Sequence, residues 1–257
     1  MEGWADPALA EAVEDVRRRM RAAADRAGRD PAAIRLIAVT KTVPAERLIA
    51  AAALGLTTFG ENRVQEAHDK RERLARLATA DPDLARLLAG VRWELIGHLQ
   101  TNKATRARDL FARVQSVDSP HLAAALSARA AAQGRMLPIL LEVNIGREVS
   151  KSGFAPDSDE LIAAARAIAA LPGLRLEGLM CVAPIVERAE DARPYFQRLR
   201  GLRDDLRAEV PLGGADDWRE LSMGMTDDFE VAIEEGATCV RVGRALFGAR
   251  PKPAGQG

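Results

Sequence analysis

The chain has 257 residues, a length that suits one (β/α)₈ barrel of about 250 residues. Of its residues, 47% are hydrophobic and 29% are charged, so the chain can bury a hydrophobic core. The 37 Lys and Arg balance 37 Asp and Glu, which excludes a dedicated nucleic-acid-binding protein. Apolar runs such as 136–145 are shorter than a membrane span of about 20 residues, and the N-terminus is acidic rather than signal-like, so we expect a cytoplasmic protein.

The predicted elements alternate between helices and strands. A helix is expected over 7–28, where Leu9, Val13 and Val16 lie on one apolar stripe and Gly28 ends it. Apolar, β-branched segments predict strands at 35–40, 57–60, 92–97, 113–117, 137–145, 175–182, 220–224 and 238–243. Further helices are predicted at 44–54, 63–78, 102–110, 120–133, 157–170, 187–209 and 227–235.

Strands separated by helices of this length indicate βαβ units and a parallel sheet. Eight units in this length favour a closed (β/α)₈ TIM-type barrel with an extra N-terminal helix, and an open doubly wound sheet is the alternative. We expect a single domain over 1–257, with 251–257 as a loose tail.

Polar side chains gather at the carboxyl ends of the predicted strands, where such barrels carry their chemistry. The opposite rim offers mainly arginines and loop residues. This asymmetry predicts a site at the carboxyl end. The residues concerned are Lys41, Asn62, His98, Gln100, Asn102, Lys103, Asn144, Glu148, Lys151, Ser222, Arg241, Gly243 and Arg244.

Lys41 directly follows the first strand. The chain has 32 Arg and only five Lys, so a surviving lysine is a candidate for the chemistry of an amine, which arginine cannot supply. A lysine amine that loses its solvation has a lowered pKa and can form a Schiff base with an aldehyde. The alternative is a lysine that extends from a strand end to solvent.

The segments LSMGMTDD and CVRVGRALFG follow the seventh and eighth strands, where barrels often bind phosphate. The hydroxyl of Ser222 and a short helix opening at Gly243 and Arg244 suit an anion. The alternative is that Gly224 and Gly243 only permit tight turns.

Other polar residues leave alternatives open. Arg241 is either a structural cation paired with a carboxylate or a ligand to a bound group, and His98 is either an acid–base group or a turn residue. Glu148 and Lys151 are expected to form an ion pair. Three scattered histidines, with Cys181 and Cys239 in apolar runs, indicate neither a metal site nor a disulfide.

Six ordered motifs then carry a resemblance over about 36–250: LIAVTKTVP, FGENRVQE, WELIGHLQTNK, LEVNIGREVSKSGF, LEGLMCVAP and the long LSMGMTDD…FGAR segment. The sequence resembles the YggS/PROSC family of pyridoxal 5′-phosphate (PLP) homeostasis proteins, which are related in fold to the barrel domain of alanine racemase. Thr101 stands where the family pattern has Ser.

The resemblance implies that Lys41 holds PLP as a Schiff base and that Asn62 lies beside the ring. It implies that Ser222 and the backbone of Gly243 and Arg244 bind the phosphate, and that Arg241 faces the pyridine nitrogen. A guanidinium stays protonated, so this nitrogen would stay unprotonated and the ring would be a weak electron sink.

Two functions are therefore considered. The first is a non-enzymatic carrier or buffer of PLP in vitamin B6 and amino-acid homeostasis, a monomer that passes PLP to apo-enzymes. The second is an amino-acid racemase with Lys41 as one base and His98 or a water as the other. The carrier is favoured because the only tyrosine, Tyr195, falls in a predicted helix and no β-rich domain follows residue 250. A Schiff-base aldolase without PLP is a third option.

Overall fold

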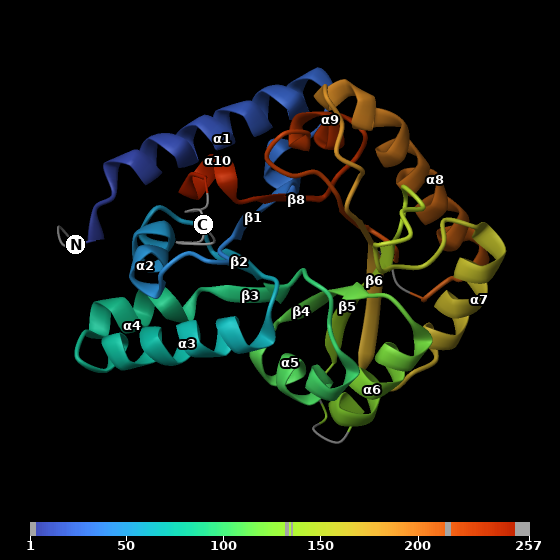
Figure 1. Cartoon of the computed structure of the whole chain (residues 1–257), viewed down its shortest axis with the longest axis horizontal. Coiled ribbons are helices and arrows are strands. Elements are labelled where there is room, and N and C mark those ends of the chain that lie inside the picture. Colours follow the sequence, from blue (N-terminus) through green and yellow to red (C-terminus); the bar gives the residue numbers. More distant parts are fainter. Residues whose placement is uncertain (1–3, 132–133, 135, 214–216, 250–257) are drawn as a thin grey trace, which may run out of the picture.

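The computed structural model describes residues 4–131, 134, 136–213 and 217–249. Eight parallel strands close into a barrel in chain order, because β1 pairs with both β2 and β8 (Figure 1). This confirms the predicted barrel and excludes the open sheet. The strands are β1 (Arg35–Val39), β2 (Thr58–Glu61), β3 (Arg92–Leu95), β4 (Arg113–Val117), β5 (Leu137–Val143), β6 (Leu174–Cys181), β7 (Glu220–Ser222) and β8 (Cys239–Val242).

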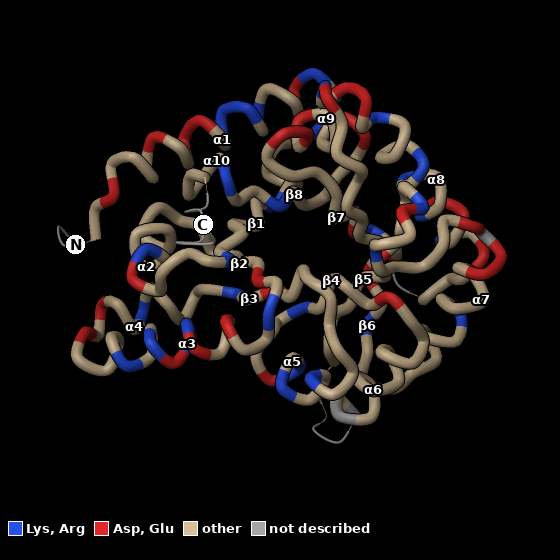
Figure 2. The backbone as a smooth tube through the Cα atoms, in the orientation of Figure 1, with Lys and Arg blue, Asp and Glu red and all other residues tan. Residues whose placement is uncertain are grey.

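The helices surround the barrel, and charges of both signs are interspersed over this outer ring (Figure 2). They are α1 (Pro7–Arg26), α2 (Ala45–Ala53), α3 (Val64–Thr79), α4 (Pro82–Ala89), α5 (Ala104–Leu110), α6 (Pro120–Ala131), α7 (Ser158–Ala169), α8 (Arg193–Glu209), α9 (Phe229–Glu234) and α10 (Arg244–Phe247). Short 3₁₀ turns occur at η2 (Pro31–Ala33), η3 (Thr101–Lys103) and η4 (Ala189–Ala192). No helix in the described ranges is long and apolar enough to cross a membrane.

Helix α4 was not predicted, although Asp81 accepts hydrogen bonds from the backbone of Asp83 and Leu84 and Pro82 occupies the first helical position. The end of the predicted helix 120–133 and the predicted loose tail 251–257 lie outside the described residues.

Helix α1 confirms the predicted N-terminal helix and its apolar stripe. Leu9, Val13 and Val16 are buried, and the helix runs along the outside of the barrel beside α9 and α10 (Figure 1). Arg19 pairs with Glu230 of α9 at 3.0 Å. The helix therefore covers the side of the barrel where β8 and β1 meet.

The barrel interior is polar at alternate positions of several strands. Arg113 pairs with Glu177 at 2.5 Å and with Glu94 at 3.5 Å, while Arg35 pairs with Glu220 at 2.6 Å. The arginines expected at the amino-terminal rim are thus neutralised by buried glutamates, so this end is filled by ion pairs. Towards the carboxyl end, the same alternation continues with side chains that carry the candidate site.

Candidate functional site

Lys41 lies just beyond β1, at the carboxyl end of the barrel, as predicted. It is half-buried and is the second residue of a tight turn in which the backbone N–H of Val43 donates to the carbonyl oxygen of Thr40 at 2.9 Å. The preceding strand residues are buried in the barrel wall. The lysine side chain therefore starts from a fixed backbone at the mouth of the barrel.

Asn62 follows β2, the strand next to β1, so it lies at the same rim. Its backbone packs closely against Gly97, which follows β3. A Cβ atom at Gly97 would lie 2.6 Å from the carbonyl oxygen of Asn62. Only glycine at position 97 allows this approach, and Gly97 thereby fixes the position of Asn62.

Arg241, Ser222 and Gln115 form a hydrogen-bonded chain across the barrel interior. Arg241 Nη1 donates to Ser222 Oγ at 2.6 Å, and Ser222 Oγ donates to Gln115 Oε1 at 2.6 Å. Arg241 Nη2 donates to the carbonyl oxygen of Cys181 at 2.7 Å. These partners of Arg241 are neutral rather than carboxylates, which favours its interpretation as a ligand over that of a cation in a structural ion pair.

A carboxylate lies near this chain. Glu142 of β5 has one buried carboxylate oxygen, Oε2, without a hydrogen-bond partner among the described residues. Burial and the neighbouring Asp118 raise the pKa of Glu142 to about 7, against the opposing charge of Arg241. Sequence reasoning missed Glu142, because a Glu within an apolar strand run gives no signal of which face it occupies.

His98 and Asp118 form a hydrogen-bonded pair at the rim. His98 Nδ1 lies 3.0 Å from Asp118 Oδ2 and 3.2 Å from Ser152 Oγ. The imidazole is exposed, so it is a hydrogen-bonded rim residue that remains open to solvent. This geometry is compatible with both interpretations made from the sequence.

The segments after β7 and β8, which the sequence predicts to form an anion cradle, lie side by side. Gly243 precedes α10, and a Cβ there would lie 3.2 Å from Val39 Cβ, so the backbone of this turn packs against β1. Thr226 Oγ1 accepts from the backbone N–H of Ala245 at 3.4 Å. The exposed Arg244 hydrogen-bonds to Asp227. Thr226 is a residue that sequence reasoning missed, although it lies in the same LSMGMTDD motif.

Ser222 occupies a different place from the rest of this cradle. Its side chain is fully buried, and its hydroxyl both accepts from Arg241 and donates to Gln115. A phosphate-binding role for Ser222 stays a prediction. Its observed partners connect it to Arg241.

Several further expectations concern residues around the rim. The predicted ion pair between Glu148 and Lys151 is confirmed at 2.5 Å, and Lys103 is exposed in η3. Both cysteines are unpaired thiols, and burial raises the pKa of Cys181 to about 12 and that of Cys239 to about 11. No metal-binding group of His, Cys, Asp and Glu occurs within the described residues.

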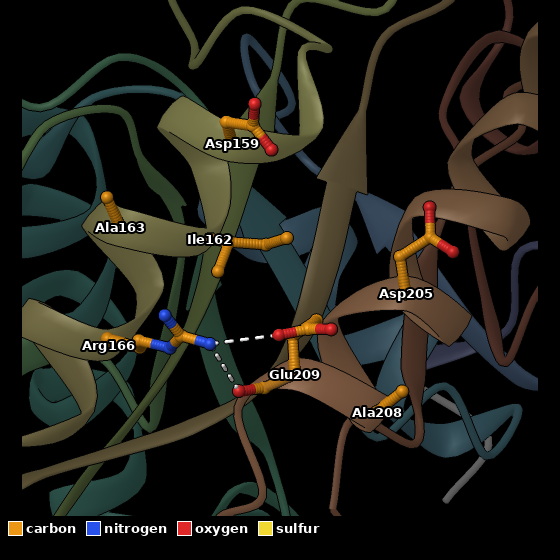
Figure 3. A pocket seen from close by; sticks show the side chains of 7 residues that line it. All are labelled: Asp159, Ile162, Ala163, Arg166, Asp205, Ala208 and Glu209. Atoms are coloured by element: carbon orange, nitrogen blue, oxygen red, sulfur yellow. Dashed lines mark hydrogen bonds and ion pairs between the residues drawn. The ribbon is translucent and has the colours of Figure 1, made fainter.

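A cavity of about 260 Å³ lies beside the mouth, in the loop that follows β5, and Asn144, Glu148 and Lys151 line it. A larger one, of about 620 Å³, lies outside the barrel between α7 and α8. There Arg166 bonds to the side chain and backbone oxygen of Glu209 (Figure 3). This outer groove contains none of the rim residues and is separate from the candidate site.

Known proteins resemble this chain over nearly its whole length. The family model for the N-terminal domain of alanine racemase matches residues 12–251. A pyridoxal phosphate homeostasis protein of Pseudomonas aeruginosa is 45% identical over 243 residues, which are 94% of this chain and 96% of that protein. The chain belongs to the pyridoxal phosphate homeostasis family.

Solved structures of other proteins have a similar barrel. PipY of Synechococcus elongatus, in a structure with PLP bound, has a TM-score of 0.77 and 33% identity, and the match covers 93% of this chain and 100% of PipY. An alanine racemase from Corynebacterium glutamicum has a TM-score of 0.64 and 17% identity, with 97% of this chain and 63% of the racemase covered. The racemase shares the fold alone.

Proposed function

We propose that this protein binds PLP and acts as a non-enzymatic carrier or buffer of it, holding it as a Schiff base on Lys41. The observation that carries the proposal is the position of Lys41 on a fixed turn at the mouth of the barrel. In its neutral form, the lysine amine adds to the aldehyde carbon of PLP and one water leaves. PLP-dependent apo-enzymes would be the recipients.

The residues around Lys41 fit such a ligand. The turn before α10 and the hydroxyl of Thr226 suit a phosphate group. Arg241 lies in the barrel interior with neutral partners, so its guanidinium can face an uncharged ring nitrogen. Asn62 follows β2, the strand next to the one that precedes Lys41, and can contact the ring edge. These polar groups support the proposal of a phosphorylated pyridine aldehyde as the ligand.

The same residues support a carrier rather than an enzyme. PLP supplies carbanion stabilisation when its ring nitrogen is protonated. Arg241 cannot give up a proton at neutral pH, so it would leave this nitrogen unprotonated and weaken that chemistry. The only tyrosine, Tyr195, belongs to the outer helix α8. Its position favours a role in packing over one as a second base for amino-acid racemisation.

An amino-acid racemase is the alternative function, and one observation favours it. His98 and Asp118 form a hydrogen-bonded pair at the mouth, an arrangement that orients an imidazole as a base. The PLP-loaded protein can be incubated with L-amino acids in deuterium oxide. A carrier gives no α-proton exchange above the rate of free PLP, whereas deuterium incorporation or the D-enantiomer indicates the racemase.

Borohydride reduction of the PLP-loaded protein, followed by peptide mass mapping, tests the proposed attachment. The expected result is a phosphopyridoxyl group on Lys41, with loss of trapping in Lys41→Ala. Lys103→Ala is the matched control, since Lys103 is an exposed lysine in η3, which follows β3. Label on Lys103 or Lys151 in place of Lys41 would contradict the assignment. An absorption band near 420 nm in the purified protein that is lost in Lys41→Ala would exclude a PLP-free aldolase.

A further inference from the structure

The turn that carries Lys41 has a strained backbone. Thr40 and Val43 close it, and Lys41 and Thr42 are its central residues. Of these two, only Thr42 has a positive φ, at +66°, as in a type II turn. Glycine is the usual residue there, and a β-branched threonine in this region is an outlier. Contacts from outside the turn must therefore hold it in place.

Lys70 of α3 supplies such contacts. Its side chain is 8% exposed. Its Nζ donates to the carbonyl oxygen of Thr40 at 2.6 Å, to Glu61 Oε1 at 2.6 Å and to Glu66 Oε1 at 2.7 Å. An ammonium group has three N–H donors, and here all three have an acceptor. Arginine, with a planar fork of five donors, cannot reproduce this geometry, which gives a reason for a lysine in an arginine-rich chain.

The two glutamates extend this contact to both sides of Lys41. Glu66 Oε1 accepts from the backbone N–H of Thr42 at 2.5 Å, and Glu61 Oε1 accepts from Thr40 Oγ1 at 2.7 Å. We call Lys70, Glu61 and Glu66 the ionic clamp. The residue before Lys41 and the residue after it are both bound to this clamp, and the strained φ of Thr42 is held by one of its carboxylates.

The ionic clamp buries charged groups, and their desolvation opposes folding. Glu61 is fully buried, and within the described residues its Oε2 has no hydrogen-bond partner. Burial raises the pKa of Glu61, even with Lys70 beside it. Apolar residues in such positions are often as stabilising as buried ion pairs. The arrangement is therefore better explained by the geometry that it imposes on the turn.

We infer that Lys70 is a positioning residue for Lys41: the ionic clamp holds the Thr40–Val43 turn so that the Lys41 amine is presented to the aldehyde of PLP. This inference rests on the proposed function. Lys70 itself would not react, because its ammonium is buried among two carboxylates and a carbonyl oxygen. The clamp acts on the backbone, and its loss lets the turn leave the left-handed conformation at Thr42.

Lys70→Met removes the ammonium and keeps much of the side-chain volume. We expect the affinity for PLP, measured by absorbance and by borohydride trapping at Lys41, to fall by about 10-fold or more. The reason is that a small displacement of the Lys41 amine strongly disfavours its reaction with the aldehyde. Hydrogen exchange at the amides of Thr42 and Val43 should become faster in the apo protein. Arg73→Met is the matched control, because Arg73 lies on the same helix and forms an exposed pair with Glu46.

Glu66 offers a second pair of variants in case Lys70→Met does not fold, because its side chain is 26% exposed. Glu66→Ala removes the acceptor of the Thr42 amide and should lower PLP affinity and speed exchange at Thr42. Glu66→Gln keeps an oxygen acceptor and should restore most of both. A failure of the glutamine to restore either property would overturn the inference.

A merely structural role for Lys70 gives a different result. In that case Lys70→Met lowers the midpoint of urea unfolding, but the folded molecules bind PLP within about two-fold of the parent and of Arg73→Met, and the inference is wrong. Failure of the proposed function is distinguishable from this, because the unaltered chain would then show no PLP trapped at Lys41. The exchange measurement on the apo protein needs no PLP.

Discussion

Arg241 and Ser222 are joined inside the barrel by a hydrogen bond of 2.6 Å between Nη1 and Oγ, although neither is near the other in the sequence. The serine hydroxyl in turn donates to Gln115, so one small side chain connects three strands. This bond holds the guanidinium in the barrel interior, where under the proposed function it would face the ring nitrogen of PLP.

Ser222→Ala should destabilise the protein by about 1–3 kcal/mol, because Arg241 Nη1 and Gln115 Oε1 both lose a buried partner. It should also weaken PLP binding, since the guanidinium is no longer held. Urea unfolding and absorbance titration measure the two effects. Ser127→Ala is the control: this buried hydroxyl bonds to Pro172 away from the site, so only stability should fall. Unchanged stability in Ser222→Ala would contradict the role of the bond.

Gly97→Ala should reduce PLP affinity several-fold. The added Cβ would lie 2.6 to 2.8 Å from three atoms of Asn62, two of them backbone, so the loop carrying Asn62 must shift. Gly201→Ala is the matched control, because the residue is inside helix α8 and, apart from the backbone of that helix and the two adjacent residues, no atom lies within 4 Å of the new Cβ. It should raise stability by about 1 kcal/mol and leave binding unchanged. Parental PLP affinity in Gly97→Ala would show that Asn62 does not contact the ligand.

Glu142 should make the apo protein less stable as the pH rises. Its pKa is raised from 4.5 to about 7 in the folded state by burial and by Asp118. The folded chain therefore binds this proton more tightly than the unfolded chain. The associated stability is fully present below pH 4.5, is lost as the pH rises through 7, and amounts to about 3 kcal/mol. Glu142→Gln should flatten urea midpoints between pH 4.5 and 8, and an unchanged slope would contradict this.

Glu220 should have the opposite dependence. Burial would raise its pKa, but Arg35 and Arg113 outweigh burial and hold the pKa of Glu220 below its ordinary value of 4.5. Its contribution to stability is present above that value and is lost as the pH falls through the lowered folded-state pKa. Glu220→Gln should therefore lose less stability than the parent below pH 4.5, measured by urea unfolding at a series of acidic pH values. A steeper loss in the variant would contradict the ion pairs.

Local sequence patterns predicted the barrel well, because the formation of a strand or helix depends largely on residues that are close together in the sequence. Apolar strand runs separated by amphipathic helices predicted all eight strands, each within two residues of its observed ends. The same reasoning put Lys41 and Asn62 at the carboxyl ends of adjacent strands. Helix α4 was missed because it is short and follows α3 almost directly.

The sequence by itself determined the fold class, the family and the end of the barrel where a reactive amine would lie. Only the tertiary structure decided which polar side chains face the interior and meet there. Ser222 and Gln115 are 107 residues apart, and Lys70 and Thr40 are 30 apart, so no local pattern connects them. Closing the barrel brings these residues together, since parallel strands and their helices align positions that are distant along the chain.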